Sequence, residues 1–249
     1  IVEAIERHGI THINFVPSMF SGFLAGLTGE EMGRLSSLKY IFLAGEALGV
    51  QVVGHYREKA GGLGVRLENL YGPTEATIYA TAYSLSGWEG QYITVPIGKP
   101  LGNMRCYIMD RYNGIQPAGV PGELLIGGMG LAEGYLNNPG LTAEKFIGIN
   151  GTKRTNKTKR AYIKLYRSGD LARWMRDGEM EYLGRIDRQV KIRGYRVELG
   201  EIESRLLEYE GVREAVAVVR EREDGDKYLC AYVPGSRELS GVILREYLT

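Results

Sequence analysis

The first ninety residues alternate between helical and extended patterns, and this alternation constrains the fold more than any other feature of the chain. A helix between two strands brings the second strand back parallel to the first. We therefore expect a parallel sheet with covering helices in this part of the chain. The helical and β-rich segments follow one another in the order 1–8, 10–16, 17–27, 38–44, 49–60 and 65–71.

Beyond about Tyr92 the pattern changes to short apolar runs separated by Gly and Pro, which is typical of antiparallel sheets and small barrels. After Gly184 a hairpin over 189–198 precedes a helix over 199–209 and further strands. We expect an α/β part, a β-barrel-like part and a small α+β domain, with the bounds 1–91, 92–186 and 187–249. The strands expected in the β-rich part are 95–98, 105–109, 122–128, 165–171 and 180–183.

Composition and charge exclude several classes of protein. The 249 residues include 31 basic and 30 acidic ones, and the net charge of +1 gives no reason to expect nucleic acid or a membrane as a partner. No run approaches the roughly 20 apolar residues of a membrane-spanning helix. Cys106 and Cys230 lie far apart and outside any metal-binding spacing, so we expect reduced thiols and a cytoplasmic protein.

Both ends of the chain fall within helical patterns, and the first residue is Ile rather than Met. We therefore expect a fragment of a longer protein. The run 150–160 holds five basic residues and no apolar one. Because an isolated basic run between two strands is usually a solvated loop, we expect a loop there rather than a nucleic-acid patch.

The segment Asn69–Glu75 reads Asn-Leu-Tyr-Gly-Pro-Thr-Glu at the end of the strand expected over 65–71. Its Gly and Pro predict a tight turn, and turns at the carboxyl ends of strands hold ligands in α/β proteins. The ring can stack on a flat ligand, the hydroxyl can donate to a phosphate and the carboxylate can hold Mg²⁺. The alternative is a turn that begins a helix at Thr74, with Glu75 in its first turn. Taken alone, the segment fits both.

Three further segments carry polar groups next to glycines. In Tyr166–Asp170 a carboxylate follows a Gly at a strand end, as in sites that bind a sugar diol, although ordinary turns also carry such an Asp. The charged link Gly184–Gly194 also fits a surface hairpin. Gly122–Tyr135 is rich in Gly, but no Lys follows the glycines, so they serve tight turns rather than a phosphate loop.

Taken together and in this order, the segments resemble the adenylation domain of nonribosomal peptide synthetases, within the adenylate-forming (acyl-CoA synthetase and luciferase) superfamily. The resemblance implies the adenylate-forming fold and a two-step ligase. An amino acid and ATP, with Mg²⁺, form an aminoacyl-adenylate, and the acyl group then passes to the phosphopantetheine thiol of a peptidyl carrier domain. A condensation domain of the same assembly line is the other implied partner. The resemblance covers essentially the whole chain, and the matched pieces are Asn69–Glu75, Gly122–Tyr135, Tyr166–Leu171 and Gly184–Glu203.

The resemblance also implies a set of nucleotide-binding residues. Tyr71 stacks on adenine, Asn69 binds the edge of adenine, and Asp170 binds the ribose hydroxyls. The other members of this set are Gly45, Glu46, Gly72 and Tyr182.

The implied catalytic residues act on the phosphates and the metal. Thr74 meets the α-phosphate, Glu75 binds Mg²⁺, and Arg185 stands near the ribose and phosphates. Asp187 is implied as the hinge about which the C-terminal domain rotates between the two half-reactions. The residues implied to face the site for thioester formation are Lys191, which is counted as catalytic, and Gly194.

A substrate pocket follows from the positions that match the family's selectivity residues. Most of these residues are apolar, and Phe42 and Tyr79 narrow the space, so we expect a neutral, largely apolar amino acid of modest size. Asn14 or Tyr79 would meet a polar tip on that substrate. Phe42 and Leu70 fit equally well as core residues. The full set is Asn14, Phe42, Ala44, Leu70, Ile78 and Tyr79.

The chain departs from the family pattern at Glu133, where the family has Arg, and at Ser168, where it has Thr. The family's phosphate loop, its Asp for the substrate amino group and its downstream Lys lie outside these 249 residues, so we expect little adenylation activity from this chain alone. Two alternatives stay open: a noncatalytic nucleotide-binding or carrier-docking remnant, and an acyl-CoA ligase. The long match over Gly184–Glu203 favours the peptide synthetase.

Overall fold

A computed structural model of the chain describes residues 1–90, 92–150, 162–222, 227–234 and 240–248. It divides into two compact units, Ile1–Ile186 and Asp187–Thr249, and each unit is described here by itself. The loop expected over 150–160 lies outside the described residues, apart from Asn150 at the end of a strand.

The first unit begins with a five-stranded mixed sheet in the order β1-β2-β3-β4-β5. The first three strands are parallel, as predicted, but β4 runs antiparallel to β3 and β5 antiparallel to β4. Only the short 3₁₀ helix η2 (Thr74–Ala76) and a turn join β3 to β4, and so short a connection allows only an antiparallel pair. The strands are β1 (His12–Phe15), β2 (Tyr40–Leu43), β3 (Arg66–Tyr71), β4 (Thr81–Ser84) and β5 (Lys99–Pro100).

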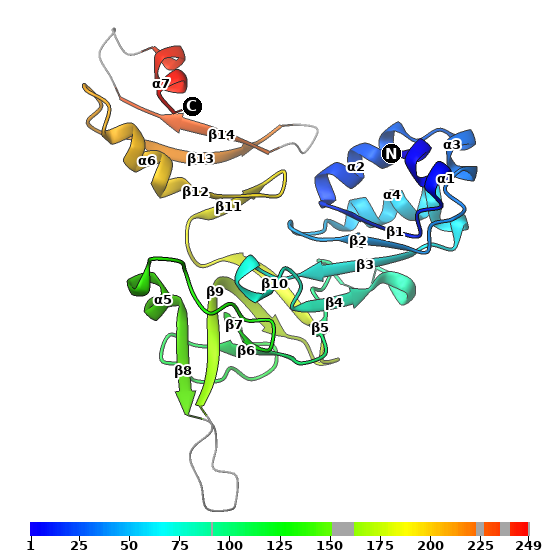
Figure 1. Ribbon diagram of the computed structural model, residues 1–249, viewed down its shortest axis with the longest axis horizontal. Helices are drawn as coiled ribbons and strands as arrows, with labels where there is room; N and C mark the ends of the chain where they lie inside the picture. The colour runs from blue at the N-terminus through cyan, green and yellow to red at the C-terminus, as the bar shows by residue number, and fades with distance from the viewer. Residues whose placement is uncertain (91, 151–161, 223–226, 235–239, 249) are drawn as a thin grey trace, which may run out of the picture. The chain divides into compact units, whose positions relative to one another are not determined.

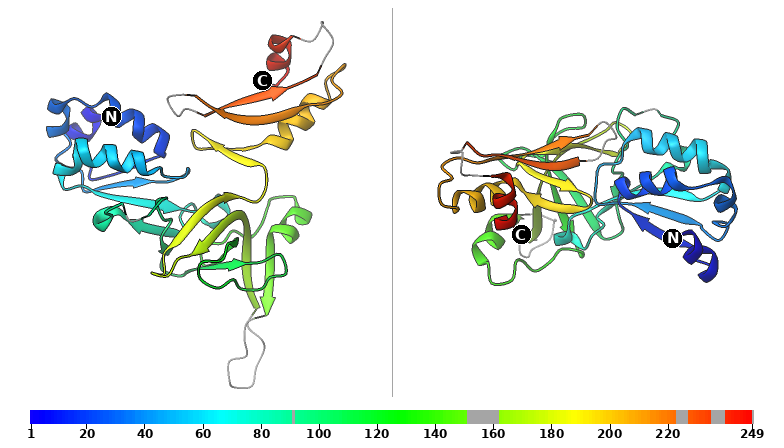
Figure 2. Two further views of the ribbon diagram at one scale, coloured as in Figure 1. Left: turned by 180° about the vertical axis from the view of Figure 1, so that it is seen from behind. Right: turned by 90° about the horizontal axis from the view of Figure 1, so that it is seen from above.

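The helices of this part gather on one face of the sheet, as Figure 1 and the rear view in Figure 2 show. Local signals set their ends, such as Pro17 in the first turn of α2 and a capping box between Thr28 and Glu31 at α3. The core between sheet and helices includes Phe20 and Leu43, neither of which is exposed to solvent. The helices are α1 (Val2–His8), α2 (Pro17–Gly26), α3 (Gly29–Gly33) and α4 (Val50–Ala60), with the 3₁₀ turn η1 (Gly61–Leu63) after α4.

The opposite face of the mixed sheet carries aromatic and polar side chains. The ring of Tyr40 lies 5.0 Å from that of His12 and 5.8 Å from that of Phe42, and both pairs are stacked. The Arg66 guanidinium lies over the Tyr40 ring, 5.5 Å from its centre. Strand alternation therefore gives this sheet one apolar face, which the helices cover, and one mixed face.

The second sheet of this unit is antiparallel and built around the long strand β9 (Tyr162–Trp174). One edge of β9 pairs with β7, while β8 and then β10 pair along the other edge, and β6 continues beyond β7. Ile108, Leu124 and Met180 are fully or almost fully buried in its core. The remaining elements are η3 (Leu85–Gly87), β6 (Met104–Met109), β7 (Gly122–Gly128), α5 (Pro139–Lys145), β8 (Phe146–Asn150) and β10 (Met180–Arg185).

The strand expected over 95–98 is wrong, because this segment makes only an isolated bridge between Gly98 and Met180. Gly98 has φ of +84°, and a Cβ placed there would lie 1.8 Å from the Ala82 carbonyl oxygen. The backbone of Gly98 therefore packs directly on that of β4, which only a glycine permits.

In its described residues, the second unit is a small α+β domain with two pairs of antiparallel strands and two helices. The turn between β11 and β12 has left-handed conformations at Arg193 (φ 51°) and Gly194 (φ 81°), as a two-residue hairpin turn requires. Leu206 and Leu244 pack in its core. The elements are β11 (Gln189–Ile192), β12 (Tyr195–Glu198), α6 (Leu199–Leu207), β13 (Val216–Glu221), β14 (Lys227–Tyr232) and α7 (Gly241–Leu248).

The predicted fold class, with an α/β part, a β-barrel-like part and a small α+β part, is confirmed. Among the helices that the structure describes, none combines the length and apolarity needed to cross a bilayer.

Candidate active site

The turn that follows β3 is shaped by a close backbone approach rather than by an unusual conformation of its glycine. A Cβ on Gly72 would lie 2.4 Å from the Ile78 carbonyl oxygen, and φ of Gly72 is not in the left-handed region. The chain doubles back here, since the Ala80 amide donates to the Tyr71 carbonyl at 2.8 Å. The helix from Thr74, which was the alternative interpretation of this segment, is present only as the single turn η2.

Two β-branched residues after η2 adopt a strained backbone. Thr77 has φ of 58° and Ile78 has φ of 69°, in the left-handed region that such residues rarely enter. The conformation is held by the Thr77 hydroxyl, which donates to the Gly130 carbonyl at 2.7 Å, and by the Ile78 amide, which donates to the Pro73 carbonyl at 3.2 Å. Strain of this kind collects at functional sites, because only a demanding environment maintains it.

Asp170 of β9 lies between Tyr71 of β3 and Arg185 of β10, so the three side chains come from both sheets of the first unit. One carboxylate oxygen accepts a hydrogen bond from the Tyr71 hydroxyl, and the other lies 2.9 Å from Arg185 Nη1. The Asp170 and Arg185 side chains are only 5% and 10% exposed. Burial and the adjacent Asp170 carboxylate raise the pKa of Tyr71 well above its ordinary value, so that the phenol stays protonated as a donor.

A bulge in β9 creates the position of Asp170, which was expected at a strand end. Gly169 has φ of +72°, and the register between β7 and β9 shifts between Glu123 and Leu125. The Ser168 hydroxyl accepts the Asp170 amide at 3.0 Å and donates to the Leu124 carbonyl at 2.6 Å. The Ser168 hydroxyl thus fixes the bulge that carries Asp170.

Glu75 and Thr74 differ in their surroundings. Thr74 is exposed, whereas Glu75 is buried and accepts a hydrogen bond from the Tyr135 hydroxyl at 2.6 Å. Burial, followed by the bond to Glu75 and the neighbouring Tyr166, raises the pKa of Tyr135 far above its usual range. Tyr135 is therefore a permanent donor to this carboxylate.

Among the residues expected to bind nucleotide, Asn69 and Glu46 already make internal hydrogen bonds. Asn69 is buried and donates from Nδ2 to the Pro96 carbonyl at 2.7 Å. Glu46 accepts the Ser18 amide at 3.0 Å, in the first turn of α2, where a helix favours a negative charge. Gly45 has φ of +91° and turns the chain between β2 and Glu46. The Tyr182 ring lies 6.2 Å from the Tyr71 ring.

The predicted pocket residues come together in part. Asn14 and Phe42 are partners in the β1–β2 register, and strand alternation places Leu70 of β3 on the same sheet face. Ala44 follows the last residue of β2. Asn14 donates from Nδ2 to the Tyr79 hydroxyl. The pocket residues differ in exposure, since Ala44 and Leu70 are buried and Ile78 is 59% exposed.

Asp187, Lys191 and Gly194 belong to the second unit and are described within it. Ile186, the last residue of the first unit, is fixed to β9 by its amide, which donates to the Gly169 carbonyl at 2.9 Å. Asp187 begins the second unit, and its carboxylate accepts the Gln189 amide at 3.1 Å.

Sequence reasoning missed Tyr135, although it noted the glycine-rich segment that ends there. It also missed Lys164, whose Nζ donates to the carbonyls of Ala132 and Glu133 at 2.9 and 2.8 Å. The Glu133 side chain is fully exposed, 4.0 Å from Lys164 Nζ. In the sequence, only their positions at or beside the matched segments pointed to these residues. No local sequence pattern shows which loop contacts Glu75.

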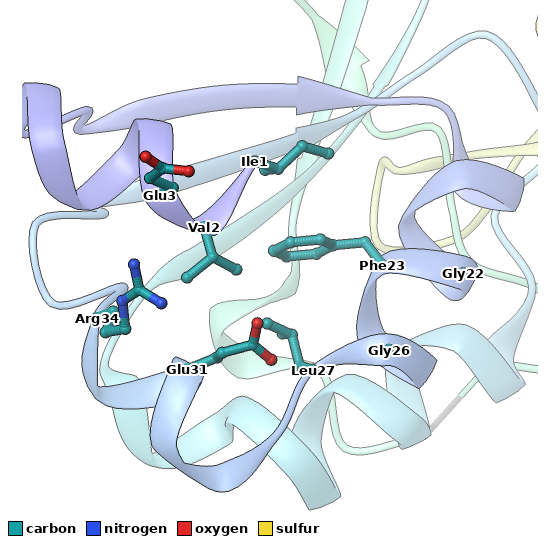
Figure 3. Close-up of a pocket in the computed structure, with 9 residues that line it drawn as sticks. All are labelled: Ile1, Val2, Glu3, Gly22, Phe23, Gly26, Leu27, Glu31 and Arg34. Atoms are coloured by element: carbon teal, nitrogen blue, oxygen red, sulfur yellow. The ribbon is translucent and has the colours of Figure 1, made fainter.

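A pocket of about 480 Å³ lies at α1, α2 and α3 and is separate from these residues. Figure 3 shows Phe23 and Leu27 facing Val2, with Glu31 and Arg34 at the polar side. None of the predicted site residues lines it. The candidate active site is therefore the turn after β3 and not this pocket.

The residues present fit a magnesium ion that is shared with nucleotide phosphates. Mg²⁺ is typically held by one or two carboxylates together with substrate phosphates and water. Glu75 offers such a carboxylate at the turn, and within the described ranges there is no cluster of three or more His, Cys, Asp or Glu that would hold a metal by itself.

The comparisons with known proteins agree with this geometry. The family model described as AMP-binding enzyme matches residues 1–136. A linear gramicidin synthase of Brevibacillus parabrevis is 48% identical over 248 residues, which are 100% of this chain and 5% of that protein. A mycosubtilin synthase of Bacillus subtilis is 42% identical over 254 residues, 100% of this chain and 9% of that protein.

A solved structure gives the same fold. The structure is that of an NRPS protein containing adenylation and PCP domains, bound to a vinylsulfonamide inhibitor. It matches with a TM-score of 0.84 at 27% identity, over 98% of this chain and 40% of that one. The chain thus spans only a small part of its curated relatives and less than half of this neighbour. By its sequence, its fold and the matched family model, the chain belongs to the AMP-binding enzyme family.

Proposed function

We propose that this chain is part of the adenylation domain of a nonribosomal peptide synthetase. In the first half-reaction an amino acid carboxylate oxygen attacks the α-phosphorus of ATP, a new P–O bond forms and pyrophosphate leaves. In the second half-reaction the acyl group passes to the phosphopantetheine thiol of a carrier domain and AMP leaves. The observation that carries this proposal is the buried Asp170 carboxylate between Tyr71 and Arg185, beside the turn that holds Glu75.

The chain's own residues bind and orient the nucleotide in this proposal. Asp170 accepts hydrogen bonds from the ribose hydroxyls, and Arg185, which pairs with that carboxylate at 2.9 Å, keeps it in place. The Tyr71 ring, next to Tyr182, offers the aromatic surface for adenine. Thr74, which is exposed on the turn, donates its hydroxyl hydrogen to the α-phosphate. Such fixed donors and charges stabilise the transition state without reorganising.

Mg²⁺, when bound through Glu75 and the phosphates, would neutralise charge that builds up on the α-phosphate. The orientation of the Glu75 carboxylate is set before the ligand arrives, because Tyr135 donates a hydrogen bond to it. The Glu75 backbone is held as well, since its carbonyl accepts the Ala132 amide at 2.9 Å.

We propose a neutral and largely apolar amino acid as the substrate. The support is that none of the predicted pocket residues is charged and that three of them, Asn14, Phe42 and Leu70, lie on one face of the sheet. The hydrogen bond between Asn14 and Tyr79 offers a polar end for that pocket. Strong preference for a charged amino acid would overturn this part of the proposal.

We propose Asp187 as the hinge between the half-reactions, with Lys191 and Gly194 facing the site in the second. The support is the unit boundary after Ile186 and the anchoring of Ile186 to Gly169. A rigid anchor directly before a domain boundary suits a rotation about the next residue. We also propose that the chain works with a carrier domain and a condensation domain of the same assembly line, and that it is located in the cytoplasm.

The test is amino-acid-dependent exchange of pyrophosphate into ATP by the natural polypeptide that carries this sequence. We expect exchange with one or a few neutral amino acids, and at least about a tenfold loss in Asp170→Asn because a ribose contact is weakened. Asp177→Asn is the matched control, since Asp177 is exposed in the β9–β10 turn. Absence of exchange with every amino acid, or equal loss in the two variants, would contradict the proposal.

A further inference from the structure

The loop Gly130–Tyr135, here called the clamp loop, contacts the turn after β3 at three points. The Gly130 carbonyl accepts the Thr77 hydroxyl at 2.7 Å, and the Ala132 amide donates to the Glu75 carbonyl at 2.9 Å. The Tyr135 hydroxyl donates to Glu75 Oε1 at 2.6 Å. The first contact holds the Thr77 side chain, the second holds the backbone of the turn at Glu75, and the third holds the Glu75 carboxylate.

The clamp loop is in turn fastened to two rigid elements. Lys164 of β9 donates to the carbonyls of Ala132 and Glu133 at 2.9 and 2.8 Å. Thr142 of α5 accepts the Tyr135 amide on its hydroxyl oxygen at 2.9 Å. Charge-assisted bonds to backbone carbonyls are the stronger kind, so Lys164 gives this loop a firm attachment to the sheet.

The side chain of Tyr135 is also fixed by packing. Its ring meets the ring of Phe146 edge to face, with centres 5.7 Å apart at 66°. Phe146 in turn packs against the buried Tyr166, with ring centres 5.1 Å apart. The packed ring of Tyr135 has little freedom to move, and it therefore holds the hydroxyl in position to donate to Glu75.

The backbone next to Tyr135 packs closely against the side chain of Thr142. Gly134 has φ of +158°, and a Cβ there would lie 2.4 Å from Thr142 Cγ2. Thr142 also donates its hydroxyl hydrogen to the Asn138 carbonyl at 2.9 Å, in the first turn of α5. The single Thr142 hydroxyl thus joins the start of α5 to Tyr135.

We propose that Tyr135 is a positioning residue, which holds the Glu75 carboxylate in the orientation that receives the divalent cation of bound ATP. The inference rests on the proposed function, because it takes Glu75 as the ligand of that cation. Outer hydrogen-bond partners of metal ligands typically change metal affinity by about 10- to 100-fold, since they set the orientation of the ligand. The clamp loop supplies this partner from outside the turn that carries Glu75.

The test is the affinity for Mn²⁺ in the presence of a nonhydrolysable ATP analogue, followed by electron paramagnetic resonance of the free ion. Tyr135→Phe keeps the ring against Phe146 and removes only the donor. We expect Mn²⁺ affinity to fall roughly 10-fold, with a smaller change in affinity for the analogue measured without metal. A larger loss of Mn²⁺ affinity than of analogue affinity distinguishes a misoriented Glu75 carboxylate from a general loss of structure.

Tyr56→Phe is the matched control, because it also removes a tyrosine hydroxyl that makes an internal hydrogen bond, here from α4 to the Val65 carbonyl at 2.8 Å. We expect it to lower the midpoint of thermal unfolding and to leave Mn²⁺ affinity unchanged. Equal Mn²⁺ affinity in Tyr135→Phe and the unchanged chain would overturn the inference. If the unchanged chain binds neither the analogue nor Mn²⁺, the proposed function fails instead.

A second pair of variants keeps the inference testable if Tyr135→Phe does not fold. Thr142→Val removes the acceptor of the Tyr135 amide at nearly constant volume, and Thr142→Ser keeps that acceptor. We expect weaker Mn²⁺ binding in Thr142→Val and near-normal binding in Thr142→Ser. Equal affinities in these two variants would likewise contradict a positioning role.

Discussion

The Arg185 guanidinium and the Asp170 carboxylate form a buried ion pair, with Nη1 and Oδ1 2.9 Å apart. Tyr71 donates to the second oxygen of the same carboxylate, so β3 of the mixed sheet is joined to β9 and β10 of the antiparallel sheet at this point. Polar groups that are this deeply buried are stable only while they keep their partners. The same three side chains therefore serve the stability of the first unit and its proposed ligand.

We predict that Arg185→Ala destabilises the chain by about 3 kcal/mol, because it leaves a buried carboxylate without its guanidinium. Arg173→Ala is the matched control, since Arg173 pairs with Glu181 at 2.6 Å but is 41% exposed. We expect the control to cost below about 1 kcal/mol. Urea unfolding of both variants measures the difference, and similar losses in the two would contradict the prediction.

Gly72→Ala and Gly22→Ala should change stability in opposite directions. The new methyl of Gly72→Ala would lie 2.4 Å from the Ile78 carbonyl oxygen, so the turn must shift and stability falls. In Gly22→Ala the methyl meets no atom within 4 Å on helix α2, and helix propensity favours Ala by roughly 0.5–1 kcal/mol. The midpoint of thermal unfolding reports both; a stable Gly72→Ala chain would show that the turn is not tightly packed.

The free energy of unfolding should fall as the pH rises above about 10. Burial raises the pKa of Tyr71 well above its usual value, and a hydrogen bond to Asp177 raises the pKa of Tyr92 to about 12. In this range the unfolded chain loses phenol protons that the folded chain keeps, so the folded state binds more protons and the unfolded state is favoured.

The measurement is urea unfolding over this pH range, combined with phenolate absorbance. We expect phenolate from Tyr71 to form only as the chain unfolds. Tyr71→Phe should show a shallower fall of stability with pH than the unchanged chain. A fall that is as steep in Tyr71→Phe would mean that other groups carry the dependence.

Cys106 should resist thiol reagents while the chain is folded. Burial raises the pKa of its thiol to about 12, and the residue is 9% exposed on β6. Because the thiolate is the reactive form, its rate of modification should follow the unfolded fraction as urea is added. Cys230 on β14 is less buried and serves as the internal comparison. Rapid modification of Cys106 in the absence of urea would contradict the packing described here.

Sequence patterns predicted most elements of the fold, because helix and strand periods and Gly or Pro boundaries are local signals. They failed at β4 and at the segment 95–98, where the deciding contact is distant. Gly98 lies against the Ala82 carbonyl, and only the folded chain shows that a side chain has no room there. In the same way, the role of Gly72 depends on Ile78 and not on its own φ.

The contacts among the predicted site residues could not be predicted from the sequence. Tyr71 and Asp170 are 99 positions apart, and no local pattern indicates that one donates to the other. The donor from Tyr135 to Glu75 comes from 60 positions away and escaped prediction for the same reason. Asn69 and Glu46 were expected to face the ligand, but their internal bonds to Pro96 and Ser18 became visible only in the structure.

The most direct test of this account is calorimetric titration of the 249-residue chain with ATP and Mg²⁺. If Tyr71, Asp170 and Arg185 form the nucleotide site, ATP binds and Asp170→Asn weakens that binding at least about tenfold, a loss of roughly 1.4 kcal/mol. Asp177→Asn, in the exposed β9–β10 turn, should bind ATP as the unchanged chain does. Binding that is equally strong in the unchanged chain and in Asp170→Asn would contradict the central claim.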